Sequence, residues 1–347
     1  MESCLALSLI SLTILQNLQT RTSAVVLNNR TAVEFPNFVP KGKISDCEID
    51  ESSGLSVSRR HTGVMYTHND KGGRNVLYAV EINSGKRLAT LTINNVINFD
   101  WEDLAYGPCA DDCRIGSCST TSAPGRYCIY ISETGDHSGD GAKNKIYMVR
   151  EPAVIRDQDV DVVDTLKFSW SESDCETLMA TPTGQLYVVS KVKNKKSKIA
   201  QIPVSAWDGG DRVALNMSQT KEIDLITTSK GPQGGDVSPG GTEMVLVFEM
   251  DVFYFYSADG DFLEVVSTQQ PQRITNYKRV ESTEAIAWSA DGQGFYTIAE
   301  GKGQIIYFYG KASTYNVGSN TCFGMNVFMN VCLSTITTVA TKLWFQA

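Results

Sequence analysis

Acidic side chains recur along this sequence at positions that a repeating fold would bring together. Glu102, Glu176 and Glu284 each begin a similar short run: Glu-Asp-Leu-Ala, Glu-Thr-Leu-Met and Glu-Ala-Ile-Ala. Carboxylates that share one enclosed space repel each other, so they must take up protons, find basic partners or bind a cation. Calcium, a hard cation that prefers oxygen ligands, suits such a set better than zinc or copper.

A second group of acidic residues follows the next strand of the repeats and would join the first group at the mouth of a central channel. The predicted metal ligands are Glu102, Glu176, Glu284, Glu133, Asp136, Glu300 and Asp70. The alternative is structural, because a Glu on an inner strand can accept hydrogen bonds from backbone N–H groups of the neighbouring repeat. For the set as a whole we expect a calcium site.

Basic residues concentrate in the run from Lys191 to Lys198. Lys191 stands at the register where other repeats carry acidic residues, so Lys191 and Lys193 are candidates for binding an anionic ligand such as phosphate, sulfate or an acidic glycan. A solvated hairpin is the favoured alternative. The sequence contains no nucleophile elbow, phosphate-binding glycine loop or His-Glu-x-x-His motif, which favours a non-catalytic site.

Short strands must position these residues. Runs rich in Val, Ile, Tyr and Phe, separated by Gly, Asp, Asn and Pro, occur throughout the chain. Four such runs between Gly54 and Ile93 form a unit that recurs with a period of about 50 residues. This predicts an all-β fold, a single β-propeller of four-stranded antiparallel blades over residues 32–311. We expect five blades, with six as the alternative, and a ring closed by the segment 32–39.

The N-terminus has the pattern of a secretory signal. The run from Leu5 to Leu15 is apolar but too short to span a bilayer, and small residues follow it up to Ala24. We therefore expect residues 1–24 to be removed and the protein to be secreted and extracellular; a buried N-terminal helix is the alternative. The sequons at Asn29 and Asn216 are then candidate glycosylation sites.

Four of the nine cysteines lie in an insertion at 107–128. They are Cys109, Cys113, Cys118 and Cys128. An oxidising compartment favours two local disulfides among them, with all three pairings open. A zinc site is less favoured because the spacing contains no paired Cys-x-x-Cys. The apolar tail, 312–347, reads as an extension pinned by a Cys322–Cys332 bridge or as a disordered end, rather than as a membrane anchor.

Charge limits the partners. The chain has 39 acidic and 31 basic residues and a formal net charge of −8, which argues against nucleic acid because phosphate neutralisation needs a basic surface. The sequence predicts no transmembrane helix in the mature chain. The expected partners are extracellular matrix components or an anionic ligand.

A set of motifs in fixed order resembles a family of mostly bacterial, secreted propellers described as similar to β-propeller phytase or to esterase-like phytase domains. The motifs lie within about 44–310 and are Glu51-Ser52-Ser53-Gly54-Leu55, Thr67-His68-Asn69-Asp70, Asp100-Trp101-Glu102-Asp103-Leu104-Ala105, Glu133-Thr134-Gly135-Asp136, Arg150-Glu151-Pro152, Gly234-Gly235-Asp236-Val237-Ser238-Pro239 and Glu284-Ala285-Ile286-Ala287. The resemblance implies a propeller with carboxylates around a channel that contains calcium.

Two functions are compatible with these features. The favoured one is a secreted, non-catalytic propeller, an extracellular binding or matrix component that binds calcium, with mineralised matrix as one setting. The alternative is a calcium-dependent phosphoric ester hydrolase of phytase type, which needs bound calcium and basic residues to hold phosphate. Lys191 replaces an acid in the third repeat and Gly235 replaces the anchor Glu in the fourth, so a phytase-like ligand set is incomplete.

Overall fold

The computed structural model describes residues 32–110, 127–135, 144–207, 210–226 and 230–312. The chain divides after Lys311 into the unit described here and a C-terminal unit, 312–347, of which only residue 312 belongs to the described part. The predicted signal, Asn29, Cys113, Cys118, Asp136 and the C-terminal tail lie outside the described residues. Within these residues, no helix has the length and apolar character needed to cross a membrane.

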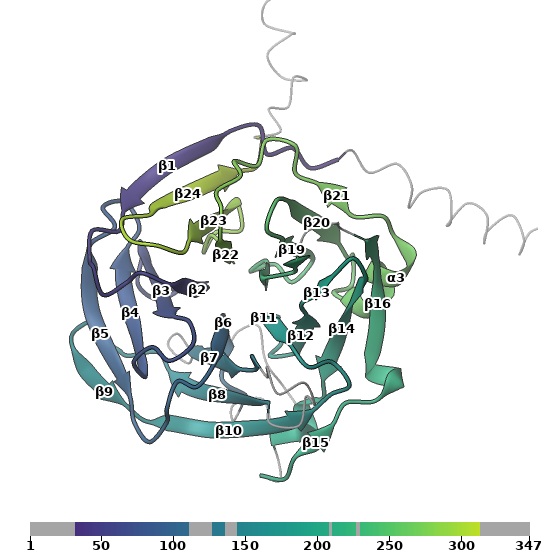
Figure 1. Cartoon of the computed structure of the whole chain (residues 1–347), viewed down its shortest axis with the longest axis horizontal. Helices are drawn as coiled ribbons and strands as arrows, with labels where there is room; N and C mark the ends of the chain where they lie inside the picture. Colours follow the sequence, from purple (N-terminus) through teal and green to yellow (C-terminus); the bar gives the residue numbers. More distant parts are fainter. Residues whose placement is uncertain (1–31, 111–126, 136–143, 208–209, 227–229, 313–347) are drawn as a thin grey trace, which may run out of the picture. The chain divides into compact units, whose positions relative to one another are not determined.

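Five antiparallel sheets form a ring, as the repeat predicts (Figure 1). The first blade contains β2 (Ser52–Val57), β3 (Val64–Asn69), β4 (Val76–Glu81) and β5 (Arg87–Ile93). The second contains β6 (Trp101–Pro108), β7 (Tyr127–Glu133), β8 (Lys145–Arg150) and β10 (Val162–Ser169). The third contains β11 (Cys175–Ala180), β12 (Leu186–Ser190), β14 (Lys196–Ile202) and β16 (Thr220–Ile226).

The fourth blade contains β18 (Gly234–Val237), β19 (Glu243–Val247), β20 (Val252–Tyr256) and β21 (Gln272–Arg273). The fifth contains β22 (Thr283–Trp288), β23 (Gly294–Ala299), β24 (Ile305–Gly310) and, from the other end of the chain, β1 (Phe38–Lys43). The inner strands β2, β6, β11, β18 and β22 surround the centre. The fold is therefore a five-bladed β-propeller.

Short strands extend the first two blades, and two more form a ribbon of their own. β9 (Gln158–Val160) pairs in parallel with β5, and β15 (Val213–Ala214) pairs in parallel with β10. β13 (Val192–Lys193) and β17 (Lys230–Gly231) form a separate two-stranded ribbon. In the described part of the chain, the helices are the 3₁₀ turns η1 (Val204–Trp207) and η2 (Met217–Gln219) and the α-helix α3 (Phe262–Thr268). α3 begins at the N-cap Asp261 and buries its apolar face beside the third and fourth blades.

The hydrophobic core is divided into five clusters, one between each pair of neighbouring blades. Between the first two blades, for example, Tyr66 and Leu77 pack on Trp101 and Ile129, and all four are buried. The two middle strands of each blade contribute to two clusters, because their alternate side chains face opposite sides of the sheet. The apolar and β-branched runs of the sequence thus cover both faces of every blade.

Buried aspartates tie the inner strands together. Asp103, on β6, accepts hydrogen bonds from the N–H of Leu178 at 3.0 Å and of Gly235 at 3.4 Å, so it joins the second blade to the third and fourth. Asp236, on β18, accepts from the N–H of Trp288 on β22 at 2.8 Å. Burial raises the pKa of both carboxyls, to about 7 for Asp236. The anchor Glu residues were considered as acceptors for backbone N–H groups of the neighbouring blade. In the second and fourth blades, the Asp that follows the anchor position makes these hydrogen bonds instead.

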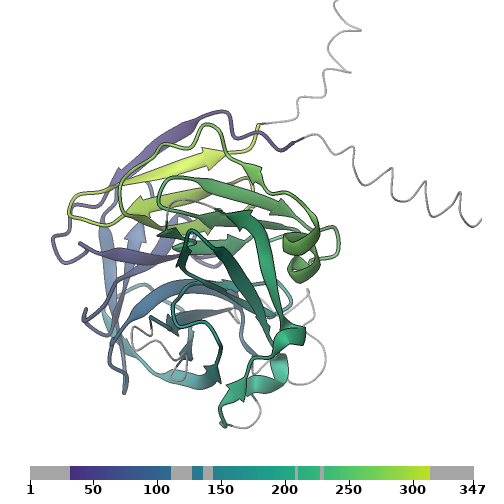
Figure 2. The same ribbon diagram turned by 45° about the vertical axis from the view of Figure 1, so that its right-hand side comes forward.

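The ring closes where the two ends of the chain meet. β1 pairs antiparallel with β24, with Phe38 opposite Tyr309, and lies along the outer edge of the fifth blade (Figures 1 and 2). The closing strand is thus the N-terminal one, as predicted, but it spans Phe38–Lys43 and shares only its first two residues with the predicted segment 32–39. Pro36 has no N–H to donate to a ladder, and Phe35 is buried against Trp288 and Phe295 instead.

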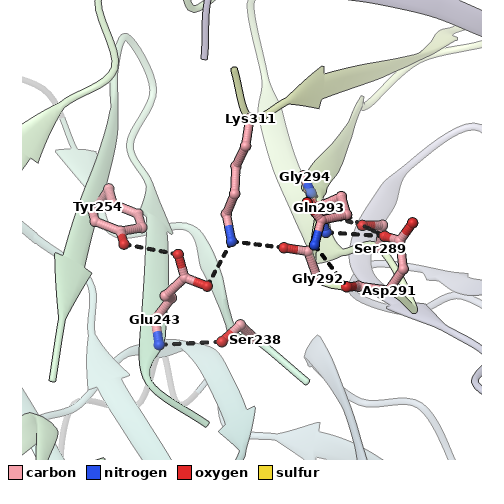
Figure 3. Close-up of polar contacts among 9 residues, drawn as sticks. All are labelled: Ser238, Glu243, Tyr254, Ser289, Asp291, Gly292, Gln293, Gly294 and Lys311. Atoms are coloured by element: carbon pink, nitrogen blue, oxygen red, sulfur yellow. Dashed lines mark hydrogen bonds and ion pairs between the residues drawn. The ribbon is translucent and has the colours of Figure 1, made fainter. Parts of the chain in front are cut away.

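A lysine fastens the end of the last blade to the fourth blade (Figure 3). The Lys311 ammonium lies 2.6 Å from a Glu243 oxygen, donates to the Gly292 carbonyl at 2.7 Å and lies over the Trp288 ring. Tyr254 donates to the other Glu243 oxygen at 2.8 Å. These contacts hold the final residues of the propeller at the interface of the two blades.

Candidate functional site

A bulge at the start of the inner strand presents the anchor glutamates to the channel. In the third blade Cys175 pairs with Ser190 and Thr177 pairs with Val189, so Glu176 has no partner in the ladder. The second and fifth blades show the same shift at Glu102 and Glu284. A bulge bends its strand and redirects a side chain. In the fourth blade, where Gly235 replaces the Glu, the register is unbroken.

The first carboxylate group consists of Asp70, Asp100 and Glu102. One oxygen from each lies within 4.8 Å of the others, and Asp100 and Glu102 are buried. Asp70 Oδ1 is buried without a hydrogen-bond partner among the described residues. Burial, followed by the charges of Glu176, Asp70 and Asp100, raises the pKa of Glu102 well above its ordinary value. The site therefore concentrates negative charge that a cation would stabilise.

Gly135 leaves room for this group. A Cβ atom at this position would lie 1.8 Å from Glu102 Oε1 and 2.6 Å from Asp100 Cγ. Glu133, two residues earlier, accepts from the N–H of Asp100 at 2.8 Å and from that of Phe99 at 3.3 Å. Glu133, the last residue of β7, thus holds the backbone beside the carboxylates, and Gly135 leaves space for their side chains.

A second group, Glu102, Asp174 and Glu176, shares Glu102 with the first and has the same 4.8 Å limit. Here a basic residue is already present: the Lys191 ammonium lies 2.6 Å from Glu176 Oε2 and 3.9 Å from Glu284 Oε1. Burial opposes the charge on Lys191, but the carboxylates raise its pKa above the ordinary value. Burial raises the pKa of Glu176 to about 8, although Lys191 opposes that shift. Lys191 thus supplies the counter-charge for this side of the channel.

Glu284 and Glu300 form a third part of the channel mouth. Gln233 donates its amide to Glu284. Burial and then the charge of Glu284 raise the pKa of Glu300 to about 7, and the two carboxyls share a hydrogen bond. Two carboxyls this close to each other disfavour a second negative charge in the pair.

Most of the predicted site residues lie together at the channel mouth. Asp70, Glu102, Glu176, Glu284 and Glu300 gather at the channel mouth with Lys191. Glu133 lies beside them, where it binds backbone N–H groups. Lys193, in contrast, is exposed on β13.

Other predicted sites lie away from the channel. Asn216 is exposed beside η2, where its side chain accepts from the N–H of Ser218. A disulfide joins Cys109 to Cys128, which confirms one bridge in the cysteine-rich insertion. Cys47 is an exposed thiol, whereas Cys175 is a buried one on the inner strand β11, between Asp174 and Glu176.

Two site residues were missed in the sequence, Asp100 and Asp174. Both stand two positions before an anchor, in Asp100-Trp101-Glu102 and Asp174-Cys175-Glu176. A bulge brings both carboxylates of such an Asp-x-Glu pair to the channel. The shared Asp-x-Glu spacing is the signal that could have identified them.

His68 is not part of the carboxylate groups. It is buried against Trp101, and its Nδ1 lies 2.9 Å from the Asn69 carbonyl oxygen. Burial lowers its pKa to about 4, so the ring is neutral at physiological pH.

Comparisons with known proteins show no family for this chain. No family model matches the chain, and no curated protein matches it. One similar solved structure is the major allergen Mala s 1 of Malassezia sympodialis, with 10% identity and a TM-score of 0.46 over 80% of this chain and 97% of that one. Another is the PQQ-bound aldose sugar dehydrogenase of Streptomyces coelicolor, with 10% identity and a TM-score of 0.43 over 79% and 98%. The resemblance to phytase-like propellers stays a prediction.

Proposed function

We propose that this protein is a non-catalytic propeller, an extracellular binding or matrix component, and that it binds calcium at the mouth of its channel. Asp70, Asp100 and Glu102 are the proposed ligands. The observation that carries the proposal is the convergence of their oxygens within 4.8 Å, with Asp70 Oδ1 buried and unpartnered among the described residues.

The chemistry of the donors favours calcium. All three ligands are carboxylates, and calcium accepts six to eight oxygen atoms in flexible geometry, with water completing the shell. Neither carboxylate group includes a thiolate or an imidazole among the described residues, and His68 Nδ1 lies 2.9 Å from the Asn69 carbonyl oxygen. Zinc and copper prefer nitrogen and sulfur donors. A bound divalent cation would offset the repulsion that raises the pKa of Glu102.

The arrangement favours one cation over two. The second carboxylate group has Lys191 within 2.6 Å of Glu176, and that ammonium occupies the channel where a second cation would need to lie. On the first group, by contrast, the basic neighbour is Lys71, which is exposed and lies 3.1 Å from Asp100. An exposed lysine can leave at little cost, because a surface ion pair contributes only about 0–1 kcal/mol.

Titration calorimetry with calcium chloride tests the proposal. We expect one calcium ion per chain and a melting temperature that rises with calcium, by the linkage of binding to folding. Chelator should reverse the rise. The absence of binding heat, together with a melting temperature that chelator leaves unchanged, would contradict the proposal.

A phytase-like phosphoesterase is the second candidate, because Lys191 and the carboxylates lie together in the channel. Against it, Lys191 is mostly buried in contact with Glu176 and Glu284, so its charge is committed to the protein. We expect no phosphate release from phytate or simple phosphate esters in the presence of calcium. Release that Lys191→Met abolishes would favour the enzyme instead.

Secretion and glycosylation are part of the same proposal. Asn216 is exposed, as a glycan acceptor must be. Expression in a secretory host should give protein in the medium whose electrophoretic mobility shifts on treatment with a glycosidase. Asn216→Gln should remove part of that shift, and intracellular, unmodified protein would contradict the extracellular assignment.

Replacing Gly135 by alanine should weaken calcium binding by at least about tenfold, equal to about 1.4 kcal/mol. The added methyl would meet Glu102 and Asp100 and force their oxygens apart. Gly240→Ala is a matched control, because the nearest atom to a Cβ there is Thr242 Oγ1 at 3.9 Å. Calorimetry on both variants measures the effect, and equal affinities would show that the carboxylates do not need their present spacing.

In chelator, the protein should lose stability as the pH rises from about 5 to about 9. Burial raises the folded-state pKa values of Asp236 and Glu300 to about 7 and that of Glu176 to about 8, above their unfolded values. The stability that these groups contribute is therefore complete at low pH and is lost as the pH rises through their folded pKa values. Each such proton contributes about 1.4 kcal/mol per pH unit.

Calorimetric melting across this pH range checks the slope, first in chelator and then in calcium. Glu176→Gln, which cannot ionise, should reduce the slope in chelator. Calcium should reduce it as well, because the cation stabilises ionised carboxylates. Stability that rises with pH in chelator would be the opposite of the expected result.

A further inference from the structure

Two apolar side chains are exposed directly beside the proposed cation site. Ile97 and Phe99 lie in the connection from β5 to β6, and each is 62% exposed. Asp100, a proposed calcium ligand, is the next residue. Single exposed apolar residues are common on protein surfaces, but a pair held beside a charged site needs a reason.

The connection is held so that these two side chains point outward. Asn98, between them, is buried and donates to the carbonyls of Asn69 at 3.0 Å and Asp70 at 3.2 Å. Its own side-chain oxygen accepts from the N–H of Trp101 at 3.0 Å. Glu133 binds the N–H groups of Phe99 and Asp100. Alternate residues thus anchor the segment, and the apolar pair is presented rather than folded inward.

Basic residues lie on the neighbouring turn. Lys71 and Arg74 both have exposed side chains, and each lies beside a carboxylate, at 3.1 Å from Asp100 and 3.7 Å from Glu48. Lys71 contacts Asp100, so this turn and the apolar pair flank the same carboxylates. Apolar side chains with basic residues around them are typical of segments that lie in the interface of an anionic membrane.

We propose that the calcium-bound protein docks through this face onto membranes that contain anionic phospholipid. This rests on the proposed calcium site. An anionic headgroup would take a coordination position that the protein leaves to solvent, while Ile97 and Phe99 enter the interfacial region. A membrane suits the patch better than a protein partner, since stable protein interfaces bury about 800 Å² on each side and two side chains cannot supply that area.

Sedimentation with vesicles tests the docking. The purified protein is mixed with vesicles of phosphatidylcholine containing phosphatidylserine, or of phosphatidylcholine alone, in calcium or in chelator. We expect binding to the anionic vesicles in calcium, reduced at least about tenfold in chelator or on neutral vesicles. Ile97→Ser with Phe99→Ser should cause a similar loss and keep the calcium affinity. Met217→Ser with Ile226→Ser, at two other exposed apolar positions, should bind like the native chain.

Calorimetry with calcium alone separates the two proposals. Calcium binding without binding to anionic vesicles would overturn the docking and leave the calcium site intact. Equal binding to neutral vesicles, equal binding in chelator, or no loss in the Ile97 and Phe99 variant would also overturn it. The melting temperatures of both double variants show that they are folded.

Discussion

Glu102→Gln should reduce calcium affinity by about 100-fold or more, equal to about 2.7 kcal/mol, while leaving the calcium-free protein at least as stable as the native chain. Glu102 is the carboxylate that both groups share, so its charge acts on either side of the channel. The same charge repels Glu176, Asp70 and Asp100 when no cation is bound. Glutamine keeps the shape and removes the repulsion.

The opposite signs of these two effects distinguish a ligand from a structural residue. Replacing a structural Glu would lower the melting temperature in chelator. Replacing a calcium ligand would lower it only when calcium is present. Glu264→Gln, at an exposed position on α3, is the control and should change neither quantity. Loss of stability in chelator with unchanged calcium affinity would show that Glu102 is structural.

Asp103→Ala should lower the free energy of unfolding by about 3 kcal/mol or more, since each unpaired buried polar group costs about 1–3 kcal/mol. The substitution would leave the N–H groups of Leu178 and Gly235, on two other blades, without their acceptor. It would also remove the acceptor for Leu104. Denaturant unfolding in chelator measures the loss apart from any effect of calcium.

An exposed aspartate with a similar bond provides the control for Asp103. Asp157 accepts from the N–H of Thr90 at 2.7 Å, but water can replace it there. Asp157→Ala should therefore cost only a few tenths of a kcal/mol. Asp103→Asn, which keeps one acceptor oxygen, should fall between the two alanine variants. Equal losses for Asp103→Ala and Asp157→Ala would mean that the bonds between blades contribute little.

The repeat in the sequence predicted the propeller and its number of blades, because each unit combines four strand patterns with turn residues at a regular period. It also predicted that the anchor glutamates converge. It could not reveal the bulges, since a bulge depends on the partner strand and the local pattern of alternation does not record it. The site residues Asp100 and Asp174 were missed for that reason.

The roles of individual carboxylates were harder to predict than their positions. Glu133 and Glu102 lie close together, yet one binds backbone N–H groups and the other faces other carboxylates. The difference depends on which donors the neighbouring backbone directs at each side chain. Likewise, Lys191 follows β12 at the edge of a basic run, and only the assembled ring shows that it turns toward Glu176 while Lys193 stays in solvent.

The pairing of β1 with β24 has a consequence for the order in which the chain folds. β1 leaves the ribosome first among the blade strands, but its partner is almost the last to be made, since Phe38 pairs with Tyr309. Until then, β1 must wait unpaired, and contacts so distant in sequence form slowly. A β24 edge that lacks its own β1 can accept the same strand from another copy. When many copies are synthesised close together, we therefore expect some of them to form dimers that exchange β1.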